Sequence, residues 1–148
     1  MKISRHALGV LFAVTAVPAL AGPAEDASAV VDQWAATYSA NNRDALVNLY
    51  APDALLFGTT DKVATRGAEA IRNYFLPLEK GGRRNAIQEK NVMVLGDDAV
   101  VVAGFYDFSR ADQNYEPRPS RYTMLIVKRD GKWMIAHHHS SPRPAERQ

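Results

Sequence analysis

Three consecutive histidines, His137, His138 and His139, close an apolar segment near the end of the 148-residue chain. Imidazole titrates close to neutral pH, so it can act as a general base, a hydrogen-bond donor or a metal ligand. The preceding residues 133–136 are of β-strand type, and a strand directs successive side chains to opposite faces. We therefore expect His137 and His139 on one face of a strand and His138 on the other.

The first and third histidines have the spacing of half a zinc or iron site. A complete site needs at least one more ligand, and no second His or Glu motif has the spacing to supply it. The chain contains no cysteine, which excludes cysteine metal sites and a thiol nucleophile. The sequence thus predicts no metal site and no cofactor. The alternative role for His137 and His139 is hydrogen bonding inside the sheet or at a subunit interface.

A carboxylate beside a tyrosine would support proton transfer, with the carboxylate as base and the phenol as donor to an oxyanion. Asp107 shares a strand face with Phe105, which makes it a candidate for an inward-facing base. Tyr106 would then face outward, so Asp107 and Tyr106 are alternatives unless a bulge intervenes. His138 is the third candidate catalytic residue.

Arg66 and Arg121 stand beside apolar segments, so each is a candidate contact for an anion. A guanidinium inside an apolar cavity holds a carboxylate through two parallel hydrogen bonds. The alternative for both arginines is an ordinary solvated position on the surface.

These residues need a scaffold, and hydrophobic spacing predicts helices first and strands afterwards. Helices are expected over residues 25–40, 43–50 and 67–76, with short strands at 54–57 and around 62–63. Strands are expected over residues 85–95, 99–109, 120–129 and 132–141. Asp130-Gly131 is a favoured two-residue hairpin turn between the last two strands. Helices followed by an antiparallel meander indicate an α+β fold, in which a strongly curved sheet and its helices form a cone around a pocket.

Residues 1–21 have the pattern of a secretory signal peptide, with basic Lys2 and Arg5, an apolar stretch and a small-x-small site ending at Ala21. The apolar stretch is too short to span a bilayer comfortably. Cleavage would leave a single exported, periplasmic domain over residues 22–148. Removing two of the 18 basic side chains leaves 16, which equals the 16 acidic ones. That balance provides no basic field for nucleic acid or for an anionic membrane.

The order of elements and three segments resemble the nuclear-transport-factor-2-like (SnoaL-like) superfamily. The segments are residues 49–58 (LYAPDALLFG), 66–75 (RGAEAIRNYF) and 128–141 (KRDGKWMIAHHHSS). The last is most similar to the branch of calcium/calmodulin-dependent protein kinase II association domains and to bacterial SgcJ/EcaC-type proteins. The superfamily contains isomerases, dehydratases, epoxide hydrolases, binding modules and assembly domains, so fold does not settle function. The chain has no kinase Gly-rich loop, HRD or DFG segment, so no kinase activity of its own is expected.

The resemblance implies that His137 and His139 are structural or interfacial and that His138 faces the cavity. It also implies a homodimer or a larger ring. The sheet face opposite the helices is the expected interface, because a monomer would expose apolar residues such as Leu125 and Val127 there.

Association domains of this branch line their cavity with arginines. This chain departs from that pattern, because Met124 and Ser140 stand at positions where those domains tend to carry arginine.

The sequence therefore predicts a protein that binds a small acidic or hydrophobic molecule, assembles with itself, or does both. The alternative is a small proton-transfer enzyme of the isomerase, dehydratase or hydrolase type, which uses a pocket His or Asp with tyrosine donors. The residues expected to line the pocket are Tyr50, Phe57, Arg66, Tyr74, Phe105, Arg121, Tyr122, Met124 and His138.

Overall fold

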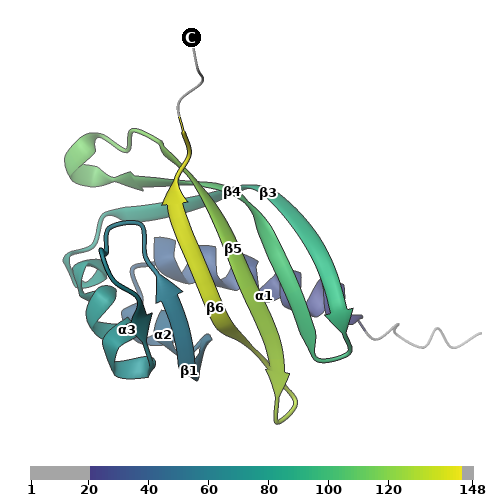
Figure 1. Cartoon of the computed structure of the whole chain (residues 1–148). Coiled ribbons are helices and arrows are strands. Elements are labelled where there is room, and N and C mark those ends of the chain that lie inside the picture. The colour runs from purple at the N-terminus through teal and green to yellow at the C-terminus, as the bar shows by residue number, and fades with distance from the viewer. Residues whose placement is uncertain (1–20, 145–148) are drawn as a thin grey trace, which may run out of the picture.

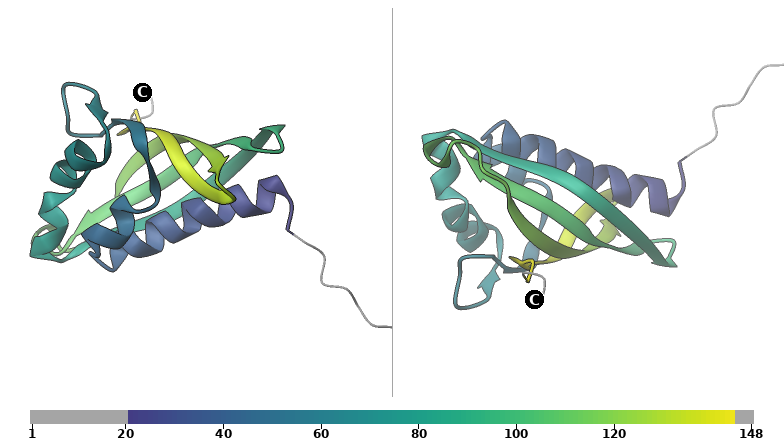
Figure 2. Two further views of the ribbon diagram at one scale, coloured as in Figure 1. Left: turned by 90° about the horizontal axis from the view of Figure 1, so that it is seen from below. Right: turned by 90° about the horizontal axis from the view of Figure 1, so that it is seen from above.

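A computed structural model describes residues 21–144. Six strands form one curved, unclosed sheet, and the helices pack against one of its faces (Figure 1). The views along the sheet show α1 lying across the concave side while the opposite face is left uncovered (Figure 2). The expected α+β cone is confirmed. The expected signal peptide lies outside the described residues apart from Ala21, so export stays a prediction.

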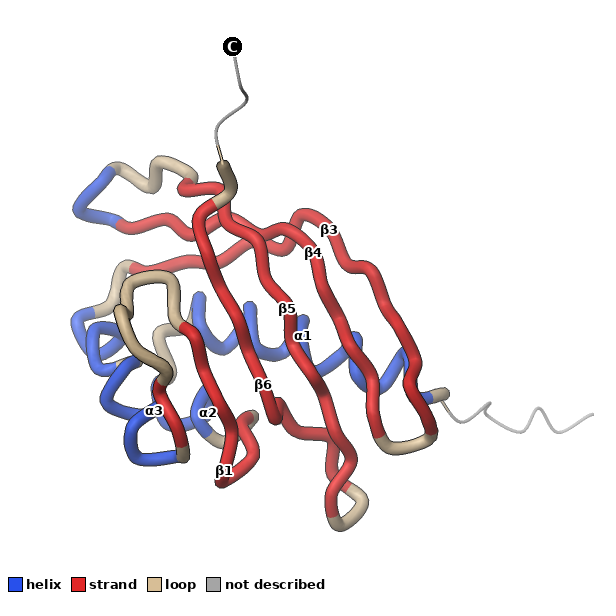
Figure 3. Tube along the Cα trace, viewed as in Figure 1, coloured by secondary structure: helices blue, strands red, loops and turns tan. Residues whose placement is uncertain are grey.

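The helical elements are α1 (Pro23–Ser39), α2 (Arg43–Val47), α3 (Ala68–Tyr74) and the 3₁₀ helices η1 (Leu76–Lys80) and η2 (Ala111–Gln113). The strands are β1 (Tyr50–Phe57), β2 (Thr65–Arg66), β3 (Arg83–Gly96), β4 (Ala99–Arg110), β5 (Arg118–Arg129) and β6 (Lys132–Pro142). They lie in the order β2-β1-β6-β5-β4-β3 (Figure 3). All neighbours are antiparallel except β1 and β6, which run parallel.

Helix α1 forms where the sequence places an apolar stripe at helical spacing. Pro23 stands at the start of the helix, where a missing N–H costs nothing. Val31, Trp34 and Tyr38 are buried on one side, against the sheet. The helix thus carries two aromatic side chains into the space between itself and the strands.

The hairpin between β5 and β6 confirms the predicted turn. Asp130 and Gly131 both have positive φ angles, 51° and 77°. This backbone suits the right-handed twist of the flanking strands, and a residue pair of this type adopts it easily. The turn fixes the phase of β6 as far as Ile135. A bulge at Ala136 then shifts the pairing by one residue, so that His138 rather than His137 faces inward.

The second predicted helix and first predicted strand differ from the structure. The helix ends at Val47 and the strand begins at Tyr50, because the backbone here pairs with β6. Ile135 donates its N–H to the carbonyl of Leu49 over 2.8 Å. Such long-range pairing overrides local propensity.

The third α-helix ends at Tyr74, two residues before its predicted end, and a 3₁₀ helix follows it. Pro77 lies in the first turn of η1, where proline is tolerated.

Within residues 21–144, none of the helices is both long and apolar enough to cross a membrane.

Gly104 lets β3 bend sharply against β4. The register of β3 shifts between Ile87 and Glu89, and a Cβ at Gly104 would lie 1.9 Å from the Glu89 carbonyl oxygen. A side chain at this position must therefore push the two strands apart.

We expect Gly104→Ala to lower the free energy of unfolding by about 2 kcal/mol, the usual cost of forcing an extra carbon into a packed site. Gly96→Ala is the matched control, because the nearest atom to its Cβ lies 3.9 Å away. Urea unfolding measures both, and equal stability of the two variants would contradict the close approach at Gly104.

Candidate ligand cavity

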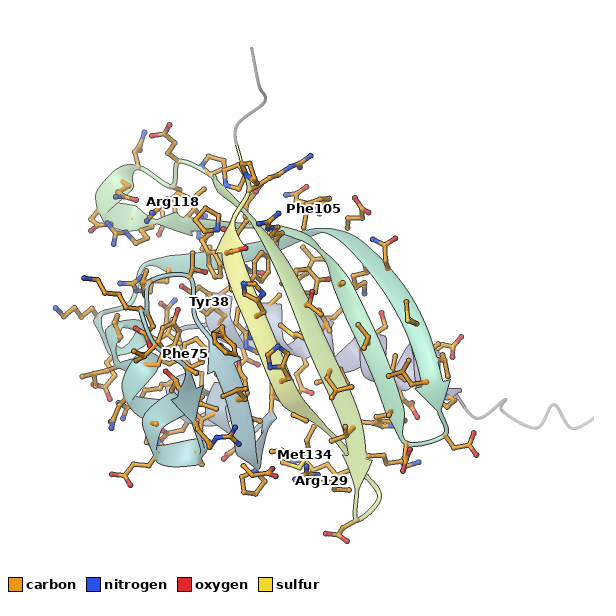
Figure 4. All side chains as sticks on the ribbon, viewed as in Figure 1. Tyr38, Phe75, Phe105, Arg118, Arg129 and Met134 are labelled. Atoms are coloured by element: carbon orange, nitrogen blue, oxygen red, sulfur yellow. The ribbon has the colours of Figure 1, made fainter. Side chains whose placement is uncertain are left out.

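A cavity of about 510 Å³ lies between the helices and the concave face of the sheet. Its wall is mostly apolar and contains several aromatic rings. Trp34 and Tyr38 stack with ring centroids 5.3 Å apart, and Phe75 packs edge-on against Tyr38 at 6.4 Å. Figure 4 labels Tyr38 and Phe75 close together on the side of the helices. The aromatic side chains of the lining are Trp34, Tyr38, Tyr74, Phe75, Tyr106 and Phe108. A cavity of this size and composition suits a small, mostly apolar molecule.

Three arginines, Arg83, Arg110 and Arg118, line the same cavity. Arg83 and Arg110 are direct partners across β3 and β4, and Arg118 begins β5. Arg118 is exposed and lies beside the loop that joins β4 to β5, which marks the open side of the cavity (Figure 4). Arg110 Nε lies 3.1 Å from a carboxylate oxygen of Asp112. No Asp or Glu side chain belongs to the described lining, so the rim of the cavity is positive.

Two buried hydrogen bonds hold His138. Its Nδ1 lies 2.8 Å from the hydroxyl of Tyr50, and its Nε2 lies 3.3 Å from the hydroxyl of Tyr106. Trp34 Nε1 donates to the same Tyr50 hydroxyl over 2.8 Å. All four side chains are at most 3% exposed. Their hydrogen bonds join β6, β1, β4 and α1 at one polar point in the core.

Burial, together with the neighbouring His137 and His139, lowers the pKa of His138 to about 3. The imidazole is therefore neutral at physiological pH. Burial also raises the pKa of Tyr50 and of Tyr106 well above the ordinary value of a phenol, so both hydroxyls stay protonated. His138 is a weak base with both ring nitrogens in use, and is poorly suited to proton abstraction.

Hydroxyl groups form a second polar feature of the lining. Thr59 and Ser140 bond to each other through their side chains, and the Ser140 hydroxyl is a polar neighbour of Tyr106. Gly58 makes room beside them, because any Cβ at this position would lie within 2.4 Å of the Tyr74 ring.

Three of the sequence-predicted site residues line the cavity: His138, Tyr106 and Tyr74. Three others, Tyr50, Tyr122 and Met124, are buried behind the lining. Tyr50 supports His138, while Tyr122 donates to the carbonyl of Glu89 over 3.1 Å.

The other five predicted residues lie away from the cavity, contrary to expectation. Asp107 faces the uncovered side of the sheet and accepts a hydrogen bond from Gln88 over 3.0 Å. Both faces of β4 are rich in apolar residues, so alternation alone could not tell which face is inward. Tyr106 faces inward and Asp107 outward, the reverse of the expected phase. The remaining four residues, all on the uncovered face, are Phe57, Arg66, Phe105 and Arg121.

Those four residues have other partners. Phe57 is 43% exposed. Arg143 lies over the Phe105 ring at 4.2 Å, and Arg121 donates to the hydroxyl of Ser141 over 3.0 Å. Arg66 pairs with Leu55 at the sheet edge and is exposed. Neither Arg66 nor Arg121 therefore lines the cavity. The three arginines that do line it, Arg83, Arg110 and Arg118, were not predicted from the sequence.

The missed arginines lie at strand ends within charged segments, where they resemble solvated loop residues. Counting back from the pair of Gly96 with Ala99 would place Arg110 opposite Asn85. Two bulges in β3 shift the pairing by two residues, so Arg110 meets Arg83 instead. The charged residues at the strand ends could have indicated an anion site. Which of them pair across the sheet, however, depends on the two bulges in β3.

His137 and His139 share one face of β6, as alternation predicts, and that face is the uncovered one. Phe57 lies beside both, at ring-centroid distances of 5.9 and 6.2 Å. Within the part of the chain that the structure describes, no three His, Cys, Asp or Glu side chains are grouped as a metal site would require.

The lowered pKa of His138 predicts a specific loss of stability in acid. Below pH 6.5 the unfolded chain gains a proton on this histidine, whereas the folded chain gains it only near pH 3. The free energy of unfolding should fall from pH 6.5 towards 3 by up to about 1.4 kcal/mol per pH unit from this group. His138→Phe should flatten that slope in urea titrations, whereas exposed His139→Gln should not. Equal slopes in all three proteins would contradict a buried neutral His138.

Comparison with known proteins identifies the family. The model of the SnoaL-like domain matches residues 27–146. A solved structure from Xanthomonas campestris, described as a calcium/calmodulin-dependent protein kinase II association domain, is 37% identical. The match covers 88% of this chain and 94% of that one, with a TM-score of 0.74. A search of curated proteins found no match.

Two more distant structures share the fold alone. A ketosteroid isomerase-like protein from Erwinia carotovora is 16% identical over 82% of this chain and 97% of its own, with a TM-score of 0.71. A dehydratase-type protein of the nuclear-transport-factor-2-like family from Streptomyces avermitilis is 12% identical over 82% and 96%, with a TM-score of 0.73. On the family match and the close relative, the chain belongs to the SnoaL-like family, and it shares the fold of nuclear-transport-factor-2-like proteins.

Proposed function

We propose that this domain binds a small acid with an apolar body in its cavity and performs no chemistry on it. The observation that carries the proposal is the combination of an aromatic lining, three arginines and no lining carboxylate. An aromatic or aliphatic body would replace water along the wall, which is the main driving force for such binding. The acid group would lie among the guanidinium groups, which hold a planar carboxylate through paired hydrogen bonds.

The charges at the rim favour an anion over a neutral molecule. Among residues 21–144, Arg83 and Arg118 form no salt bridge, and Arg110 contacts one carboxylate. The rim therefore carries an excess of positive charge next to a low-dielectric wall, where its field is poorly screened.

The absence of a suitable base is the reason for preferring binding over proton transfer. His138 has both ring nitrogens hydrogen-bonded and a pKa near 3. Asp107, the expected carboxylate base, faces away from the cavity. Among the described lining residues, no other carboxylate or imidazole takes the role.

We further propose that the domain associates with itself through the uncovered sheet face. Met93, Val101 and Leu125 are direct neighbours across β3, β4 and β5, and continue to His137 on β6. Met93 is 62% exposed. A second copy would cover this apolar row, and the description of the Xanthomonas relative as an association domain supports that partner. Export to the periplasm belongs to the same proposal and rests on the signal-peptide pattern of residues 1–21.

Binding is tested with 2-naphthoate and with its uncharged analogue 2-naphthamide by isothermal titration calorimetry. We expect the acid to bind at least about tenfold more tightly, since hydrogen bonds between charged partners contribute more than neutral ones. Arg118→Gln should remove most of that preference. Arg121→Gln, on the opposite face, is the matched control and should leave it unchanged. Equal affinity for acid and amide would contradict an anion site.

Self-association is tested by light scattering after size-exclusion chromatography. Leu125→Asp combined with Met93→Asp should convert an oligomer into monomers, because it buries two carboxylates in the proposed contact. Val63→Asp changes an equally apolar residue that is 74% exposed in the loop between β1 and β2, and should leave the oligomer intact. A monomeric wild-type protein would refute this part of the proposal, and naphthoate titration of the same samples shows whether binding survives.

A further inference from the structure

Hydrogen bonds beneath the cavity form a chain with a fixed direction. It begins at Trp34, whose indole N–H can donate and cannot accept. This group lies 2.8 Å from the Tyr50 hydroxyl, whose oxygen is therefore an acceptor. Tyr50 is 3% exposed, so its own hydroxyl hydrogen needs a partner in the protein. His138 Nδ1 at 2.8 Å is that partner.

This contact fixes the tautomer of His138. Because Nδ1 accepts, the single hydrogen of the neutral imidazole is on Nε2. Nε2 lies 3.3 Å from the Tyr106 hydroxyl, so it donates to that oxygen. The opposite tautomer would direct two donors at the Tyr50 oxygen and leave the Tyr50 hydrogen buried without an acceptor.

The chain ends on the cavity wall. Tyr106 lines the cavity and has the Ser140 hydroxyl as a polar neighbour, and Ser140 and Thr59 bond to each other through their side chains. Ser140 and Thr59 together have two hydroxyl hydrogens, and their mutual bond uses one. Within residues 21–144 neither hydroxyl forms another hydrogen bond, so the second hydrogen has no acceptor there. Both residues line the cavity, so a ligand can accept that hydrogen.

We infer that the ligand presents a hydrogen-bond acceptor, a carbonyl or carboxylate oxygen, to the Thr59–Ser140 hydroxyl pair, in addition to its acid group at the arginines. This inference rests on the proposed function and narrows the ligand class to apolar keto acids and diacids. Both polar parts of the cavity then act as donors, because guanidinium groups have no acceptor. A protonated amine at the same place would leave the hydroxyl hydrogen unsatisfied and would add positive charge near the arginines.

Nitrogen NMR of the histidine ring tests the direction of the chain without any ligand. In protein labelled with ¹⁵N-histidine, correlations between ring nitrogens and ring protons distinguish a protonated nitrogen from an unprotonated one. We expect His138 to carry hydrogen on Nε2 and none on Nδ1, with Tyr50→Phe as the assignment variant. A proton on Nδ1 would mean that the chain runs the other way and would overturn the inference.

Calorimetry tests the ligand class with matched acids of two lengths. 4-Acetylbenzoate and 6-acetyl-2-naphthoate are compared with their ethyl and aminomethyl analogues. We expect at least one acetyl acid to bind about tenfold more tightly than its ethyl analogue, and the aminomethyl acids to bind worst. Thr59→Val with Ser140→Ala should abolish the preference for acetyl over ethyl. Thr123→Val, on the uncovered face, should retain it, and thermal unfolding checks that each variant is folded.

The outcomes separate the two proposals. If acids bind but acetyl and ethyl analogues bind equally at both lengths, the acceptor inference fails and the proposed binding of apolar acids stands. If no acid binds while His138 has the expected tautomer, the proposed function fails, and the ligand class inferred from it fails as well.

Discussion

The buried hydrogen bond between Tyr50 and His138 is the interaction on which the rest of the structure depends. Both side chains are at most 3% exposed, and a buried polar group without a partner is costly. The bond can form only if β1 lies beside β6, and the parallel pairing of these strands provides that arrangement. Trp34 of α1 joins the same point. One polar contact therefore fixes how the first helix, the first strand and the last strand pack together.

The same contact is the reason why we propose binding rather than proton transfer for a fold shared with isomerase-like and dehydratase-type proteins. A cone-shaped cavity needs a base at its inner end to move a proton. Here that position holds a neutral imidazole whose two nitrogens are bonded to Tyr50 and Tyr106. The polar groups that remain on the wall are arginines and hydroxyls, and their common property is that they donate hydrogen bonds. Function follows from this lining and cannot be read from the fold.

Strand alternation gives the two faces of the sheet different roles. On β6, His138 belongs to the cavity, while His137 and His139 lie beside Phe57 on the uncovered face. Partial burial and the neighbouring His139 lower the pKa of His137. The three histidines are adjacent in sequence, yet they belong to two surfaces with separate chemistry.

Local patterns in the sequence determined the apolar stripe of α1, the Asp130-Gly131 turn and the split of the three histidines between two faces. Each depends on residues within a few positions of one another, so periodicity and turn chemistry are sufficient. Only the tertiary structure decided that β1 extends back to Tyr50, that Tyr106 rather than Asp107 faces inward, and that Arg83 meets Arg110. The physical reason is that strand pairing and bulges join residues far apart in the chain. A strand with apolar residues on both faces, such as β4, gives no local sign of which face the core will cover.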